Sequence, residues 1–186
     1  IMGYDVNKPL NVTNFIFDKM RQFPDLLGLK VGDEKFSYGQ IIKFSLQTAS
    51  ILKYLGAKKE AVGLIGQRSA SSYFATLGII FAGCHYVPIN LKYSLDKQLK
   101  MIQDSKIRFL VGSREDLEAF SAALDEKTRE GIEAWVVPAG KSDFGNKRWF
   151  GETTLDNIPM LDEPESEQVS HLTYIVYTSG STGHPK

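Results

Sequence analysis

Short apolar runs alternate with longer amphipathic segments along most of this chain. The runs at 61–66, 85–89, 107–112 and 133–138 are rich in Val, Ile, Leu and aromatic residues. Between them, apolar residues recur every three or four positions, as they do on the buried side of a helix. Buried strands that alternate with helices are typical of a mostly parallel sheet with helices on both faces. We therefore expect an α/β fold.

The first third of the chain predicts two helices and a hairpin. A helix over 12–23 is expected to bury the stripe formed by Phe15, Ile16, Met20 and Phe23. Strands at 27–31 and 34–37 flank a Gly-Asp turn. The clearest helix follows at 38–55, and Gly56 suits its left-handed C-terminal stop. Its buried side is expected to contain Ile41, Ile42, Ser45, Ala49, Leu52 and Leu55.

Serines are available to cap the later helices. Ser94 precedes an amphipathic helix that runs to about residue 106, and Ser113 with Asp116 predicts a capping box for the helix that ends near Leu124. The stretch 139–167 is rich in Gly, Asp, Pro and Glu, and we expect a long surface excursion there. Residues 171–179, HLTYIVYTS, are then expected to return as a strand.

Composition limits the classes of function. The 186 residues include 22 basic and 22 acidic ones, so the formal net charge is zero, which argues against nucleic-acid binding. The single cysteine, Cys84, excludes an intrachain disulfide and fits a reducing cytoplasm, which is the localisation we expect. Neither a signal peptide nor a membrane span is recognisable, and the histidines and the cysteine show no metal-ligand spacing.

The most informative chemistry is the glycine-rich stretch TSGSTG at 178–183. Glycines let the main chain approach a ligand closely, and consecutive N–H groups can form an anion-binding nest. Hydroxyls and a lysine can add donors to phosphate oxygens. The pattern is not a Walker motif, because two residues separate the second glycine from the lysine. A flexible Ser/Gly surface loop is the alternative reading of this stretch taken alone.

The stretch YTSGSTGHPK, at 177–186, resembles the phosphate-binding signature of the adenylate-forming enzymes. This superfamily contains acyl-CoA synthetases, the adenylation domains of nonribosomal peptide synthetases and firefly-type luciferases. Three upstream segments resemble the family in the same order, so the resemblance covers nearly all of the chain. They are FSYGQI at 36–41, FAGCHYVPIN at 81–90 and IQDSKIRFLV at 102–111.

This resemblance implies the N-terminal part of the large domain of an adenylate-forming enzyme, over residues 1–186, cut within the phosphate loop. It implies an ATP- and Mg²⁺-dependent ligase that converts a carboxylic acid to an acyl-adenylate, releases pyrophosphate and then passes the acyl group to a thiol. We expect no catalytic residue and no metal ligand within this portion, which alone should be inactive. The residues expected to hold the β- and γ-phosphates are Thr178, Ser179, Gly180, Ser181, Thr182, Gly183 and Lys186.

The branch of the superfamily sets the expected partners. CHYVPIN resembles the amino-acid-activating domains, which favours an amino acid as substrate and the phosphopantetheine of a carrier protein as thiol. Asn90 also resembles acyl-CoA synthetases, which use CoA. The alternatives are therefore an acyl-CoA synthetase, a non-catalytic nucleotide-binding or interaction module, and an unrelated α/β protein with a chance loop. A sheet that lacks its further strands would expose an edge through which the chain could self-associate.

Overall fold

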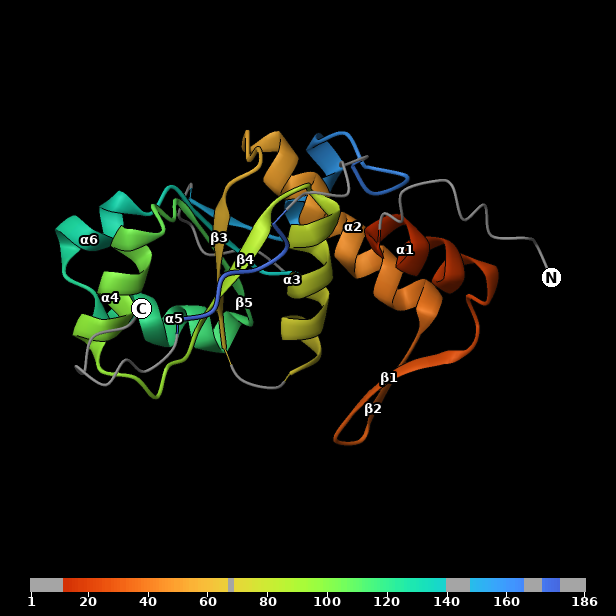
Figure 1. Ribbon diagram of the computed structural model, residues 1–186, viewed down its shortest axis with the longest axis horizontal. Helices are drawn as coiled ribbons and strands as arrows, with labels where there is room; N and C mark the ends of the chain where they lie inside the picture. Colours follow the sequence, from red (N-terminus) through yellow and green to blue (C-terminus); the bar gives the residue numbers. More distant parts are fainter. Residues whose placement is uncertain (1–11, 67–68, 140–147, 166–171, 178–186) are drawn as a thin grey trace.

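The computed structural model describes residues 12–66, 69–139, 148–165 and 172–177 (Figure 1). Helices and strands alternate along the chain, as the sequence predicts. In chain order, the elements are α1 (Val12–Gln22), β1 (Leu27–Val31), β2 (Glu34–Ser37), α2 (Tyr38–Tyr54), β3 (Ala61–Ile65), α3 (Ala70–Phe81), β4 (His85–Ile89), α4 (Leu95–Asp104), β5 (Phe109–Gly112), α5 (Arg114–Ala123), α6 (Glu126–Gly131), β6 (Ala134–Val136), β7 (Trp149–Phe150) and the 3₁₀ helix η1 (Glu152–Asn157).

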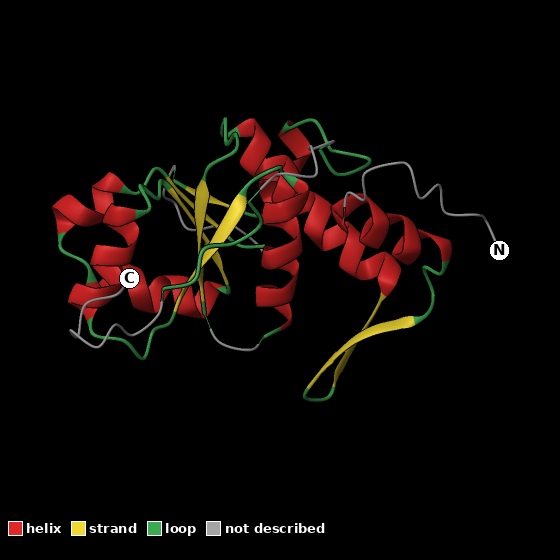
Figure 2. Cartoon of the chain, in the orientation of Figure 1, coloured by secondary structure: helices red, strands yellow, loops and turns green. Residues whose placement is uncertain are grey.

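The centre of the molecule is a parallel sheet of five strands in the order β4-β3-β5-β6-β7. In the longest pairing, Ala61 lies opposite His85 and Ile65 opposite Ile89. The strands β1 and β2 form a separate antiparallel hairpin around Gly32, whose φ is 59°. Figure 2 shows this hairpin extending away from the main sheet. The predicted α/β fold is confirmed.

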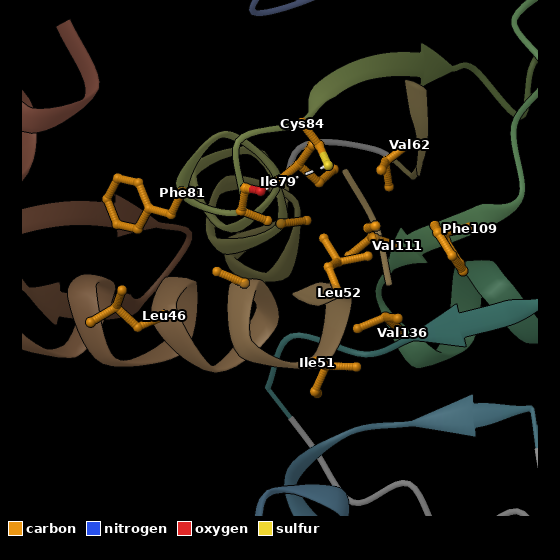
Figure 3. Packing of buried hydrophobic residues seen from close by; sticks show 14 of the residues in the cluster. Leu46, Ile51, Leu52, Val62, Ile79, Phe81, Cys84, Phe109, Val111 and Val136 are labelled. Atoms are coloured by element: carbon orange, nitrogen blue, oxygen red, sulfur yellow. Dashed lines mark hydrogen bonds between the residues drawn. The ribbon is translucent and has the colours of Figure 1, made fainter. Parts of the chain in front are cut away.

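Helices cover both faces of the sheet because its strands alternate their side chains between two cores. Val62, Val111 and Val136 pack with α2 and α3 on one face (Figure 3). Leu110 and Trp135 pack with α4 and α5 on the other face. Both cores contain fully buried aliphatic and aromatic side chains, so the parallel sheet is a central layer between two helical ones.

The helices α2 and α3 approach each other closely at Gly78. A Cβ atom at this position would lie 2.5 Å from Cβ of Thr48 and 2.8 Å from the carbonyl oxygen of Ser45. The predicted face of α2 is confirmed, since its members are buried or half-buried. Gly56 follows the helix with a φ of 80°, as expected for a left-handed stop.

The predicted buried face of α1 is wrong in part. Phe17 and Met20 are buried, and Phe17 packs edge-on against Phe81 at 5.7 Å between ring centroids. Phe15, Ile16 and Phe23, which we expected to be buried, are 40%, 36% and 53% exposed. Apolar residues cover roughly 200° of the helix at 100° per residue. This arc is wider than one contact face, so the sequence could not show which part of it packs.

At Ser113 the predicted cap hydrogen bond is confirmed, but the reciprocal bond of a capping box, from the Ser113 backbone N–H to the Asp116 carboxylate, is replaced by one from the Ser113 hydroxyl. The cap predicted at Ser94 is wrong in detail. The Ser113 hydroxyl accepts a hydrogen bond from the Asp116 N–H, at 3.2 Å, and donates one to the Asp116 carboxylate, at 2.8 Å. Ser94 occupies the N-cap position of α4, but its side chain makes no cap hydrogen bond. Ser69 caps α3, so a serine does begin that helix as expected.

Two C-terminal segments differ from their predictions. The expected surface excursion at 139–167 contains β7, which pairs parallel with β6 and extends the sheet. Ile158 is buried in the core, and the Leu161 N–H donates to the Ser50 hydroxyl of α2 at 2.9 Å. The strand expected at 171–179 is reduced, in its described part, to one parallel bridge between Tyr174 and Tyr86 of β4. The sequence predicted neither outcome, because both depend on pairing between distant segments.

Candidate functional site

The residues predicted to hold phosphate, 178–183 and Lys186, lie outside the described part of the chain. The structure does describe the segment that leads into them. The Tyr86 N–H donates to the Thr173 carbonyl at 3.1 Å, and the Ile175 N–H donates to the Tyr86 carbonyl at 3.0 Å. The chain therefore runs parallel to β4 shortly before the glycine-rich stretch begins.

Tyr177, the last described residue, is held by α4. Its hydroxyl shares a hydrogen bond of 2.7 Å with the hydroxyl of Ser105, which caps the C-terminal end of that helix. Ile175 and Tyr177 both pack against the core on the α4 and α5 side of the sheet. These contacts fix the point at which the chain enters the predicted loop.

An open cavity of about 580 Å³ lies where β3 and β4 end. In parallel α/β sheets the carboxyl ends of the strands are the usual place for ligands. Most of the lining comes from the ends of these two strands and from the first turns of α3. The lining residues are Leu64, Gly66, Ser72, Tyr73, Thr76, Pro88, Ile89, Asn90 and Lys92.

The cavity is lined by both apolar side chains and polar groups. The Thr76 hydroxyl donates to the Ser72 carbonyl at 2.8 Å, and the Asn90 side-chain oxygen accepts the Lys92 N–H at 2.9 Å. The Lys92 side chain belongs to an exposed residue of this lining. Hydroxyls, a primary amide and an ammonium group together suit a polar ligand that carries negative charge. The sequence did not predict that these residues gather.

A buried amide that the sequence analysis missed supports this lining. Gln98 of α4 is only 4% exposed, and its Nε2 donates to the carbonyl oxygens of Asn90 and Tyr93, at 3.1 and 2.9 Å. It therefore pins the turn that contains Asn90 and Lys92. The signal was available, since Gln98 shares the apolar face of α4 with Met101 and Ile102, where a polar residue needs a partner.

The amino ends of the strands carry an ion cluster with a structural role. Arg108 donates two hydrogen bonds of 2.9 Å to the Glu60 carboxylate and one of 2.8 Å to Glu133. Partial burial raises the pKa of the Glu60 carboxyl, but hydrogen bonds from Arg108 and from the Lys58 N–H outweigh burial and leave this pKa below its ordinary value. The cluster ties together the segments that lead into β3, β5 and β6.

Cys84 has no features of a nucleophile, and the described residues form no metal centre. Burial raises the pKa of the Cys84 thiol, which keeps it protonated and unreactive. Within the described ranges, no group of three or more His, Cys, Asp and Glu side chains could hold a metal ion. In the same ranges, no helix has the length and apolar character needed to cross a bilayer.

Comparison with known proteins places the chain in a family. The model of the AMP-binding enzyme family matches residues 16–186. Bacitracin synthase 1 of Bacillus licheniformis is 29% identical over 172 residues, which are 91% of this chain and 3% of that protein. Tyrocidine synthase 3 of Brevibacillus parabrevis is 25% identical over 170 residues, which are 91% of this chain and 2% of that protein.

Solved structures share the fold. The anthranilate CoA ligase AuaEII, in complex with anthranoyl-AMP, superimposes with a TM-score of 0.77 at 22% identity, over 97% of this chain and 34% of that one. The chain thus spans about a third of this structural neighbour and only 3% and 2% of the two synthases. The family match extends through the described fold and the glycine-rich stretch alike, and the chain belongs to the AMP-binding enzyme family.

Proposed function

We propose that this chain is the N-terminal part of the large domain of an ATP-dependent ligase. The ligase activates a carboxylic acid as an acyl-adenylate, with release of pyrophosphate, and passes the acyl group to a thiol. The observation that carries this proposal is the family match over 16–186, which includes the whole glycine-rich stretch. The activity belongs to the complete protein, and we propose that residues 1–186 alone do not catalyse it.

In this proposal, residues 178–183 and Lys186 bind the β- and γ-phosphates of ATP. The donor chemistry fits a triphosphate, because hydroxyls, glycine N–H groups and an ammonium group all donate to anionic oxygens. Mg²⁺, as the counter-ion of the nucleotide, would neutralise part of the phosphate charge. The loop residues then hold the triphosphate in line with the attacking carboxylate, so that most of the catalytic contribution is positioning and electrostatic stabilisation. Thr178 and Ser179 are the hydroxyls expected to contribute most.

The proposed substrate is an amino acid, and the proposed thiol is the phosphopantetheine of a carrier protein. The sequence CHYVPIN at 84–90 supports this choice, together with the similarity to bacitracin synthase 1 and tyrocidine synthase 3. Activation of another acid for transfer to CoA is the second candidate, which Asn90 favours. The two candidates differ in the acid that supports the first step and in the thiol that accepts the product.

Acid-dependent ATP–pyrophosphate exchange tests the proposal. The protein encoded by the complete reading frame should exchange label with one class of acid, and amino acids are the expected class. Thr178→Ala and Ser179→Ala should each lower exchange about tenfold or more, because a donor to the leaving pyrophosphate is lost. Ser121→Ala, on α5 and outside the loop, is the matched control and should leave exchange unchanged.

Three outcomes would contradict parts of this proposal. Exchange with none of the acids would refute the ligase itself. Undiminished exchange in both loop variants would refute the assignment of the phosphate site. A burst of pyrophosphate from the 186-residue chain, after addition of acid and ATP, would refute the statement that this portion is inactive. Transfer of the activated acid to CoA rather than to a carrier protein would favour the second candidate.

A further inference from the structure

The segment 172–177 leads the chain to the residues that are predicted to hold phosphate (Figure 1). Two main-chain hydrogen bonds to Tyr86 hold its first part, together with the stack of the Tyr174 ring on the Tyr86 ring. In the described part of the chain, the Tyr177 hydroxyl makes the last hydrogen bond before the glycine-rich stretch. Since Tyr177 is joined directly to Thr178, the contacts that hold Tyr177 restrict the start of that stretch.

Ser105, the partner of Tyr177, lies at a tightly closed helix end. It is the C-cap of α4, and its hydroxyl oxygen lies 2.7 Å from that of Tyr177. Lys106 follows with a left-handed φ of 54°, and the Ile107 N–H donates to the Ile102 carbonyl at 3.0 Å, which is the Schellman arrangement. Ile102 and Ile107 are both buried in the core beneath the helix. The Ser105 hydroxyl is therefore a fixed anchor.

The hydrogen bond adds a directional restraint to contacts that are otherwise packing. The Tyr177 ring is half-buried and packs, with Ile175, against the core on the α4 and α5 side of the sheet. A ring that only packs can still shift along its neighbours, whereas a hydrogen bond between two hydroxyls restricts both a distance and an angle. The bond to Ser105 therefore limits the movement of the main chain at Tyr177.

We propose that Ser105 and Tyr177 are positioning residues for the binding of ATP. Their hydrogen bond holds the entry to the glycine-rich stretch, so less conformational freedom is lost when this stretch closes on the phosphates. Neither side chain touches the nucleotide. Ser105 lies 72 residues before Tyr177, so the glycine-rich motif does not contain it. This inference rests on the proposed function, through the assignment of residues 178–183 and Lys186 to the phosphates.

Removal of either hydroxyl tests this role. Tyr177→Phe keeps the ring and loses only the phenolic hydroxyl, and Ser105→Ala removes the other partner. Tyr174→Phe is the matched control, because Tyr174 lies in the same segment and its hydroxyl makes no hydrogen bond within the described ranges. The variants are made in the protein encoded by the complete reading frame. Calorimetry measures the Kd for ATP without acid, and ATP–pyrophosphate exchange measures kcat and the KM values for ATP and acid.

We expect Tyr177→Phe and Ser105→Ala each to raise the Kd for ATP about three- to tenfold, as the loss of one hydrogen bond would. Tyr174→Phe should bind ATP as the wild type does. The double variant should bind no more weakly than the single ones, since both substitutions break the same bond. In exchange, the KM for ATP should rise by a similar factor, while kcat and the KM for the acid stay within about twofold of the wild type.

Several results would overturn this inference. They are unchanged ATP binding in both single variants, losses that add in the double variant, and an equal loss in Tyr174→Phe. A KM for the acid that rises as much as the KM for ATP would show a general structural defect and would overturn it as well. A wild-type protein that binds ATP but exchanges with none of the acids would refute the ligase, while weaker ATP binding by the two variants would still support the positioning role. A wild-type protein that binds no ATP would refute both.

Discussion

Replacement of Gln98 by methionine should destabilise the protein without changing the volume of its core. Gln98 is buried, and its amide donates to two carbonyl oxygens of the turn that carries Asn90 and Lys92. Methionine has a similar length and helix propensity, so the helix itself is little affected. The change therefore isolates the two hydrogen bonds and the partners that they satisfy.

The two hydrogen bonds set the magnitude. Each contributes about 0.5–1.5 kcal/mol, so their loss should cost about 1–3 kcal/mol of unfolding free energy. The Asn90 carbonyl keeps a second donor, the Tyr93 N–H at 3.0 Å, which limits the cost at that oxygen. With a urea m-value of about 2 kcal/mol per molar, the denaturation midpoint should fall by roughly 1 M.

Urea denaturation, monitored by circular dichroism, measures this effect, and Gln103→Met on the same helix is the control. Gln103 is exposed, so its substitution should change the unfolding free energy by less than about 0.5 kcal/mol. If Gln98→Met costs no more than Gln103→Met, then the amide does not pin the turn. If the cost appears together with a changed m-value, the variant has altered the denatured or native ensemble instead.

Three further predictions concern packing and charge. Gly78→Ala should lower the thermal midpoint despite a gain in helix propensity, because the added methyl group would clash with Thr48 and with the main-chain oxygen of Ser45. An unchanged midpoint would contradict the close approach of α2 and α3 at this position. Ser45→Ala should raise the thermal midpoint, because the buried hydroxyl of Ser45 has no hydrogen-bond partner among the described residues. A lower midpoint would indicate that this hydroxyl does make a stabilising hydrogen bond. The lowered pKa of Glu60 stabilises the fold above the ordinary glutamate pKa, and this contribution is lost as pH falls through the folded pKa. Denaturation of the wild type and of Glu60→Gln, followed from neutral to acidic pH, should therefore converge at the acid end, whereas a constant difference would refute the role of Arg108.

The local elements were predictable because their signals are contiguous. The strands β3 to β6 and the helices α3, α4 and α5 follow from apolar periodicity, and the hairpin follows from its Gly-Asp turn. The short helix α6, which buries no residue, was not predicted. The glycine-rich stretch could also be recognised from the sequence, since a phosphate-binding loop carries its hydrogen-bond donors on neighbouring residues. Its placement stays a prediction, because residues 178–186 lie outside the described ranges.

The cavity at the ends of β3 and β4 could not be predicted in the same way. Its residues come from two strands and a helix that are separated in the chain, and they meet only because those strands pair. Gln98 is an intermediate case, since its position on an apolar helix face signalled a buried amide without naming the carbonyl groups that it contacts.

By itself, the sequence determined the alternation of strands and helices, the hairpin turn, the cap at Ser113 and the residue types of the predicted phosphate loop. These features depend on neighbouring residues, whose spacing is set by the geometry of the chain. Only the tertiary structure decided the strand order, the addition of β7, the pairing of Tyr174 with Tyr86 and the choice of Phe17 rather than Phe15 as the buried ring of α1. Each of these depends on contacts between distant residues, for which several local patterns compete and the packed core selects one.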